Sequence, residues 1–226
     1  MKGITELKNL YLNDDIYILA SGASMNHIDP SFFENKITIG VNQVFKKFKC
    51  DYIVRKEASQ IPESIKSGAD VICSTWDSGD INKGKRKKNR DFHPTLDFYT
   101  FDHLDNGHTN IDFSILGTDK IVVSYSTITS AIHMAAYMGA KNIMIAGHDC
   151  GVINDKYVFD GYYDNINETP WKDWNAYVQW LSVIEDQTKQ IKDRLIDFYG
   201  CNIMSINPFI NYNLEGNKFN GKNKIN

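Results

Sequence analysis

The sequence predicts an α/β fold in which a mostly parallel sheet carries helices on both faces. Three observations lead to this prediction. The chain has 226 residues, 42% of them hydrophobic, which is enough for one sizeable core. Short apolar runs recur along it, as is typical of parallel strands that are buried on both faces. Helical patterns alternate with the later runs, and this alternation indicates a Rossmann-like arrangement.

Seven apolar runs are predicted to form strands, because each is short and bounded by small or polar residues. Ser21 and Gly22 follow the first run, which indicates a strand that enters a tight turn. The expected strands are residues 15–20, 37–41, 51–54, 70–73, 121–123, 142–146 and 201–206.

Two helices are predicted from apolar side chains in helical register. The first covers residues 130–138 and is followed by Gly139, a typical helix stop. The second is expected to begin at Thr169 and Pro170, because Thr caps helices and Pro fits the first turn. It continues through regularly spaced aromatic and aliphatic residues to Gly200.

The chain is expected to form a single domain over residues 1–208. Residues 77–114 are polar and break the alternation, so they are predicted to be an insertion. Residues 151–170 are predicted to form a lid-like loop, and residues 209–226 a flexible C-terminal tail.

The charge and cysteine content argue against several classes of protein. The formal net charge is −3 and the pI is about 6.1, so we expect no nucleic-acid partner. The four cysteines are scattered without CxxC spacing, and no cluster of His, Asp and Glu suggests a metal site or a metal cofactor.

No secretory signal or membrane-spanning run is evident, which predicts a cytoplasmic protein. The basic run from Lys83 to Arg90 is either a solvated loop or a contact with the inner face of a membrane or an anionic acceptor.

Polar groups follow the predicted strands and are expected to meet at one edge, because ligands bind beyond the carboxyl ends of parallel strands. The groups are Ser21, Gly22 and Ser24; Asn42 and Gln43; Arg55, Lys56 and Glu57; Ser126, Thr127, Thr129 and Ser130; and Gly147, His148 and Asp149. Backbone amides near Gly22 and at the start of the helix near Ser130 can bind a phosphate. An ordinary turn and ordinary helix capping explain the same residues, and capping is compatible with anion binding.

Acid–base chemistry is expected at the end of the sixth run. Asp149 can accept hydrogen bonds from a ribose, and His148 is either a proton-transfer group or a structural hydrogen-bonding side chain. Tyr162 and Tyr163 follow in the lid-like loop, where their hydroxyls can contact a leaving phosphate or simply cover the sheet edge.

Three blocks of the sequence resemble bacterial lipooligosaccharide sialyltransferases. Residues 18–29, ILASGASMNHID, are similar to the family's GNGPSL…ID, and residues 40–45, GVNQVF, to its CNQF. Residues 128–149 resemble its ITSG…GY.EIYLSGIDF, and also the YMGFKEIYLLGVDH of the 6-hydroxymethylpterin pyrophosphokinase-like family. The sialyltransferase resemblance implies a nucleotide-sugar fold of a GT-A-like variant and a metal-independent transferase that uses a CMP-sugar. It places Ser21, Ser24, Asn42, Thr129, Ser130 and Asp149 by the nucleotide or donor carboxylate, and Tyr162 and Tyr163 by the leaving phosphate.

One departure from that family concerns the catalytic base. The family uses a His in its lid, whereas residues 164–174 contain none. The base is therefore left open among Asp164, Glu168, Asp173 and His148. Our first hypothesis is a glycosyltransferase of surface glycan or lipopolysaccharide biosynthesis, with a glycan or lipid-linked acceptor and a homo-oligomeric assembly. The alternatives are an Mg-ATP-dependent pyrophosphokinase of the hydroxymethylpterin type and a non-catalytic nucleotide or sugar-nucleotide binding protein.

Overall fold

A computed structural model describes residues 2–77, 87–104, 111–162 and 173–206. Within these ranges, eight strands form one sheet in the order β1-β6-β5-β4-β3-β2-β7-β8, and every neighbouring pair is parallel. The strands are β1 Lys2–Gly3, β2 Asp15–Leu19, β3 Ile37–Val41, β4 Tyr52–Arg55, β5 Asp70–Ser74, β6 Tyr99–Phe101, β7 Asn142–Ala146 and β8 Asn202–Ser205. The predicted α/β fold with a parallel sheet is confirmed.

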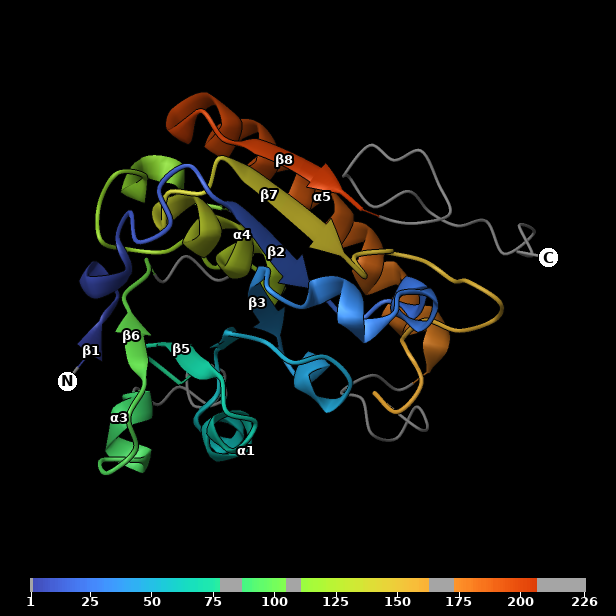
Figure 1. Cartoon of the computed structure of the whole chain (residues 1–226), viewed down its shortest axis with the longest axis horizontal. Coiled ribbons are helices and arrows are strands. Elements are labelled where there is room, and N and C mark those ends of the chain that lie inside the picture. The colour runs from blue at the N-terminus through green and yellow to red at the C-terminus, as the bar shows by residue number, and fades with distance from the viewer. Residues whose placement is uncertain (1, 78–86, 105–110, 163–172, 207–226) are drawn as a thin grey trace.

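The strand order reverses beside β2. From β2 the chain steps through β3, β4 and β5 toward one edge, and it later returns to place β7 and β8 on the other side (Figure 1). Strand β2 therefore pairs with β3 on one flank and with β7 on the other. Connections that leave two adjacent strands in opposite directions open a crevice at their carboxyl ends. The fold thus predicts a ligand site where β2 and β7 end.

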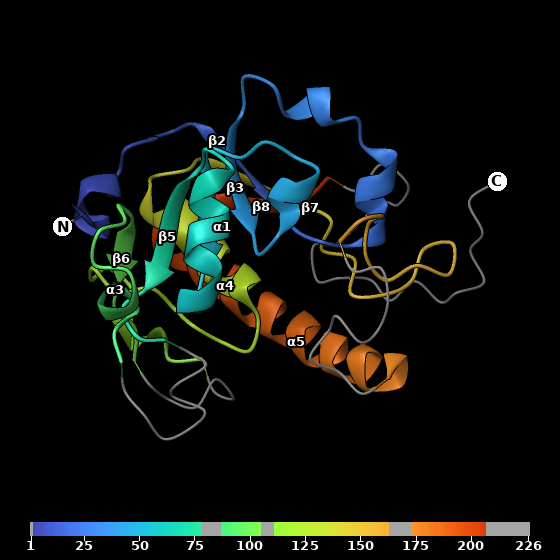
Figure 2. The ribbon, with the colours of Figure 1, turned by 90° about the horizontal axis from the view of Figure 1, so that it is seen from below.

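Helices cover both faces of the sheet (Figures 1 and 2). Ile16 and Ile18 pack into one cluster with residues of α4 Thr127–Tyr137 and α5 Trp174–Tyr199, whereas Leu19 packs with the short helices on the opposite face. This alternation follows from the two-residue period of a strand. The remaining helices are η1 Ile4–Leu7, η2 Ala23–His27, η3 Pro30–Phe33, η4 Val44–Lys46, η5 Ala58–Gln60, α1 Ile61–Lys66, α3 Asn89–Phe92 and η6 Phe113–Ile115. None of the helices in the described ranges is long and apolar enough to cross a membrane.

Three strand assignments differ from the prediction, namely residues 121–123, β6 and β1. Residues 121–123 are buried but form no strand, because their backbone groups bond elsewhere: the Ile121 amide donates to the Asp102 carbonyl and the Val122 amide to a His133 ring nitrogen. Strand β6 lies inside the segment that was expected to be a polar insertion, between β1 and β5. Both β1 and β6 are too short to show periodicity.

Both predicted helices exist, with different starts. Helix α4 begins at Thr127, because Ser126 caps it by accepting a hydrogen bond from the Ile128 amide at 3.3 Å. Helix α5 is capped by Asp173, whose carboxylate accepts from the Ala176 amide at 2.8 Å. The predicted start at Thr169 and Pro170 lies outside the described residues. The predicted stop is confirmed, since Gly200 follows the helix with φ 69°.

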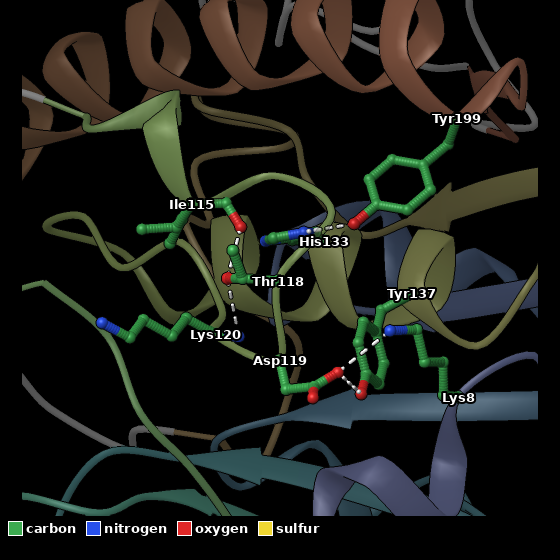
Figure 3. A network of polar contacts seen from close by, with 8 residues as sticks. All are labelled: Lys8, Ile115, Thr118, Asp119, Lys120, His133, Tyr137 and Tyr199. Atoms are coloured by element: carbon green, nitrogen blue, oxygen red, sulfur yellow. Dashed lines mark hydrogen bonds and ion pairs between the residues drawn. The ribbon is translucent and has the colours of Figure 1, made fainter.

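A buried histidine joins α4 to its surroundings (Figure 3). The Val122 amide donates to His133 Nδ1 at 3.0 Å, so the neutral ring carries its proton on Nε2, which lies 3.0 Å from the Tyr199 hydroxyl of α5. Burial lowers the pKa of His133 to about 3. One turn further on, Tyr137 donates to the Asp119 carboxylate at 2.8 Å. The helix is therefore fixed by polar contacts as well as by apolar packing.

This histidine makes stability depend on pH. Because the pKa of His133 is about 3 in the folded chain and 6.5 in the unfolded chain, unfolding takes up a proton between these values. The neutral His133 ring makes its full contribution to the free energy of unfolding above pH 6.5. As the pH falls from 6.5 toward 3, the free energy of unfolding decreases by about 1.4 kcal/mol per pH unit. We expect His133→Gln to reduce the pH dependence of the unfolding free energy, measured with urea, by this slope. The exposed His27→Gln is the control, and equal slopes for wild type and His133→Gln would contradict the assignment.

Candidate functional site

A cleft opens at the carboxyl ends of β2 and β7, where the strand order reverses. It holds about 530 Å³ of empty space, counting the part that is open to solvent. Its lining comes from the loops after β2, β3 and β7, the start of α4 and the first half of α5. The lining residues are Ala20, Ser21, Gly22, Val41, Asn42, Ser126, Ile128, Gly147, His148, Asp149, Cys150, Gly151, Tyr157, Tyr177, Trp180, Leu181 and Ile184.

The loops after β2 and β7 are tied together by a buried carboxylate. Asp149 accepts from the Ser24 amide at 2.8 Å and from the Ser24 hydroxyl at 2.6 Å. The Gly22 amide donates to the Gly147 carbonyl at 2.7 Å. A side chain at Gly22 would collide with Asp149 and with the Gly147 carbonyl, whose oxygen would lie 2.5 Å from the added carbon. Glycine is therefore required for the close approach, and the backbone of this loop forms one side of the cleft.

The loop after β3 brings one amide side chain to the cleft. Asn42 lines it and has φ 56°, a left-handed conformation that Asn adopts more readily than most residues. Gln43 lies next to it but does not line the cleft, and its Oε1 atom is buried without a hydrogen-bond partner among the described residues. The structure thus brings Asn42, but not Gln43, together with the other polar loops.

Of the hydroxyl residues that were expected at the start of α4, Ser126 lines the cleft. Thr129 and Ser130 are fully buried and do not line the cleft. Ser130 donates to the Val122 carbonyl at 2.9 Å, and Thr129 donates to the Ser126 carbonyl at 2.9 Å. Ser24 is likewise fully buried. These three side chains shape the loops around the cleft from behind, and any direct contact between them and a ligand stays a prediction.

A lysine after β4 holds the loop that leads into α4. Lys56 Nζ donates to the Ser124 carbonyl at 2.9 Å and to the Tyr125 carbonyl at 3.3 Å. From the opposite side, the Tyr125 amide donates to Gln187 of α5 at 3.2 Å. Burial lowers the pKa of Lys56 to about 8. The loop before Ser126 is therefore anchored from both β4 and α5.

His148 reaches the cleft as a neutral ring. Its Nε2 atom lies 2.8 Å from the hydroxyl oxygen of Thr188, a fully buried residue of α5, and the Cys150 sulfur lies 3.6 Å from the same nitrogen. Burial lowers the pKa of His148 to about 4, so the ring is neutral at neutral pH and is a weaker base than an ordinary histidine. Burial also raises the pKa of the Cys150 thiol, which therefore stays protonated.

Aromatic rings from the loop after β7 and from α5 form an aromatic wall of the cleft, and they were not among the predicted site residues. Tyr157 and Tyr177 meet edge to face with ring centroids 5.7 Å apart, and Trp180 lies 5.9 Å from Tyr177. Tyr162, which was predicted to face a phosphate, is buried against Phe159 at 5.1 Å and does not line the cleft. Tyr163 lies outside the described residues. The aromatic wall forms only when α5 packs beside the loop after β7, so no sequence pattern within either segment predicts it.

The basic run is described only in part. Lys83 and the residues up to 86 lie outside the described ranges. Lys88 lies over the Trp76 ring, and Arg90 lies over the Phe98 ring and donates to the Phe98 carbonyl at 2.7 Å. These side chains are engaged within the chain, and a membrane contact stays a prediction. Among the described residues, no group of three or more His, Cys, Asp or Glu side chains could hold a metal ion.

Comparison with known proteins finds likeness in structure alone. No protein-family model and no curated protein matches the sequence. The fold is similar to that of the monofunctional α-2,3-sialyltransferase Cst-I from Campylobacter jejuni, with a TM-score of 0.50 and 14% identity over 87% of this chain and 77% of that one. The sialyltransferase CstII from Campylobacter jejuni, in complex with a substrate analogue, cytidine-5′-monophosphate, aligns with a TM-score of 0.48 and 14% identity over 88% of this chain and 82% of that one. The likeness to Cst-I shows a shared fold.

We expect the Asp149 carboxylate, which joins the loops after β2 and β7, to stabilise the folded chain. In Asp149→Ala, the buried amide and hydroxyl of Ser24 lose their acceptor, and an unsatisfied buried donor costs about 1–3 kcal/mol. We expect the free energy of unfolding, measured with urea, to fall by about 2–4 kcal/mol. Asp14→Ala, an exposed site at the opposite end of β2, should change it by less than about 0.5 kcal/mol. Equal free energies of unfolding for Asp149→Ala and Asp14→Ala would show that the contact between Asp149 and Ser24 does not stabilise the fold.

Proposed function

We propose that this chain is a glycosyltransferase that takes a sugar from a nucleotide sugar, with a CMP-sugar as donor and without a metal. The observation that carries the proposal is the cleft at the reversal of strand order, where Gly22, Asn42 and Ser126 meet. Each belongs to or adjoins one of the three sequence blocks that resemble sialyltransferases. The fold shared with Cst-I supports the same reading, since Cst-I is a sialyltransferase.

The phosphate of the donor fits the polar end of the cleft. The first turn of α4 presents the positive end of the helix dipole and backbone amides that have no partner within the helix. Ser126, which caps the Ile128 amide, adds a hydroxyl. Asn42 and Ser21, which line the cleft in the loops after β3 and β2, carry side-chain groups that can donate further hydrogen bonds. These neutral donors stabilise the negative charge that develops on the phosphate as it leaves.

Transfer proceeds by direct displacement at the anomeric carbon. The acceptor hydroxyl forms its bond to that carbon while the bond from carbon to phosphate oxygen breaks, and the leaving nucleotide keeps the electron pair. His148 lines the cleft as a neutral imidazole and accepts the proton of the hydroxyl. Asp149 accepts two hydrogen bonds from Ser24 and so fixes the loop that carries His148. A direct contact between Asp149 and the ribose belongs to the same proposal.

The setting of the reaction follows from the donor. We propose a glycan or a lipid-linked sugar as acceptor, in surface glycan or lipopolysaccharide biosynthesis at the inner face of the membrane. The pyrophosphokinase alternative rests on the sequence resemblance of residues 128–149 alone. It needs carboxylates that hold Mg²⁺, and the described residues present no cluster of three or more such groups. The non-catalytic alternative predicts nucleotide binding without turnover.

Thermal unfolding with nucleotides tests the proposal. CMP at 100 times its dissociation constant should stabilise the chain by about 2.7 kcal/mol, or roughly 5–10 °C in Tm, equally with Mg²⁺ and with EDTA. Release of CMP from a CMP-sugar in the presence of a glycan acceptor should follow. Stabilisation by Mg-ATP alone would overturn the proposal in favour of the pyrophosphokinase, and binding of CMP without any turnover would favour the binding protein.

The substitution Asn42→Asp tests the contribution of Asn42 to nucleotide binding without changing the fold. Asp tolerates the left-handed backbone of this position as Asn does, but its negative charge would lie beside the donor phosphate. Asn42→Asp should weaken CMP binding at least tenfold by isothermal titration and leave Tm without ligand within about 2 °C. The matched control is Asn35→Asp, which has φ 60° on an exposed turn. Equal CMP affinity in both variants would remove Asn42 from the site.

A further inference from the structure

The aromatic wall of the cleft has a function that the phosphate contacts do not explain. We propose, resting on the proposed function, that Trp180 of α5 stacks on the nucleobase of the donor. Tyr157 and Tyr177 shape the slot in which the base lies. The wall would then make the cleft select a whole nucleotide over a sugar phosphate.

The cleft is polar at one end and apolar at the other. The polar residues that line the cleft from the loops after β2 and β3 and from the start of α4 are Ser21, Asn42 and Ser126. The α5 side presents Tyr177, Trp180, Leu181 and Ile184. A nucleotide has the same two parts, since its phosphate needs hydrogen-bond donors and its base offers flat apolar faces. Sugar hydroxyls would need polar partners, which the aliphatic part of this wall does not offer.

The rings of the wall are held in place before any ligand binds. Tyr177 is buried and contacts Tyr157 on one side, at an interplanar angle of 83°. Tyr177 also contacts Trp180, whose ring is tilted by 31° to it, and Trp180 remains partly exposed at the cleft. A rigid ring that is partly exposed loses little conformational entropy when a flat ligand stacks on it.

Polar contacts set the distance between the wall and the phosphate end. Gln187 of α5 accepts from the Tyr125 amide, one residue before Ser126. One residue further along α5, Thr188 contacts His148, in the loop after β7. Both bonds lie about two helical turns from Trp180, so α5 holds the ring at a fixed position relative to both loops. This arrangement suits a ligand with a fixed separation between base and phosphate.

The test compares ligands that share the phosphate but differ in the base. Isothermal titration measures CMP and ribose 5-phosphate against wild type, Trp180→Ala, Trp180→Phe and the control Trp76→Ala, whose indole lies by Lys88 away from the cleft. Alanine in place of a stacking residue should weaken CMP binding about 5- to 150-fold. Ribose 5-phosphate binding should be unchanged. Phenylalanine keeps a flat ring, so Trp180→Phe should bind CMP within about fivefold of wild type, and it should lose the fluorescence change that CMP produces.

The outcomes separate this inference from the proposed function. If wild type binds CMP and Trp180→Ala binds it equally well, the stacking inference is wrong and the glycosyltransferase proposal stands. If Trp180→Ala weakens CMP and ribose 5-phosphate by the same factor, the residue supports the cleft without contacting the base, and the inference is again wrong. If wild type binds no nucleotide, both are wrong. Because each variant is judged by the ratio of its two affinities, a partly unfolded preparation does not mimic the expected result.

Discussion

The cleft depends on the contact between Asp149 and Ser24. It joins the loop after β2 to the loop after β7, which are 125 residues apart in sequence and adjacent only because their strands pair. A buried carboxylate needs hydrogen bonds, and here the Ser24 amide and hydroxyl supply them. Gly22 must lack a side chain for the loops to approach this closely. The shape of the side of the cleft that the loops after β2 and β7 form therefore follows from one interaction and one glycine.

The remaining sides are positioned from the carboxyl edge of the sheet and from α5. Lys56 holds the loop before α4, while Gln187 and Thr188 of α5 hold that loop and His148. Helix α5 thus acts both as a wall and as a link between the groups proposed to bind phosphate and to accept a proton. The pKa of His148 is low because the ring is buried, so its proton affinity depends on the same packing.

Much of the fold could be predicted from the sequence, because buried parallel strands leave apolar runs and α4 leaves a helical period. Strand β6 and the form of residues 121–123 could not, since they depend on which backbone groups find partners in three dimensions. The loops that meet at the cleft were predicted from strand ends. The sequence did not predict which side chains of these loops face the cleft. For example, Ser130 is buried because it donates to the Val122 carbonyl, eight residues away in a non-regular segment. The aromatic wall joins a loop and a helix that only tertiary packing brings together.

Amide hydrogen exchange with and without CMP most directly tests whether this cleft is the nucleotide site. Ligand binding should slow exchange of amides in residues 20–26, 42–44, 124–130 and 147–151, which come from four separate stretches around the cleft, and leave β5 and β6 unchanged. Protection confined to these segments is the result that the account predicts. Protection centred on the region of β5 and β6, or no change at concentrations of CMP that raise Tm, would contradict it.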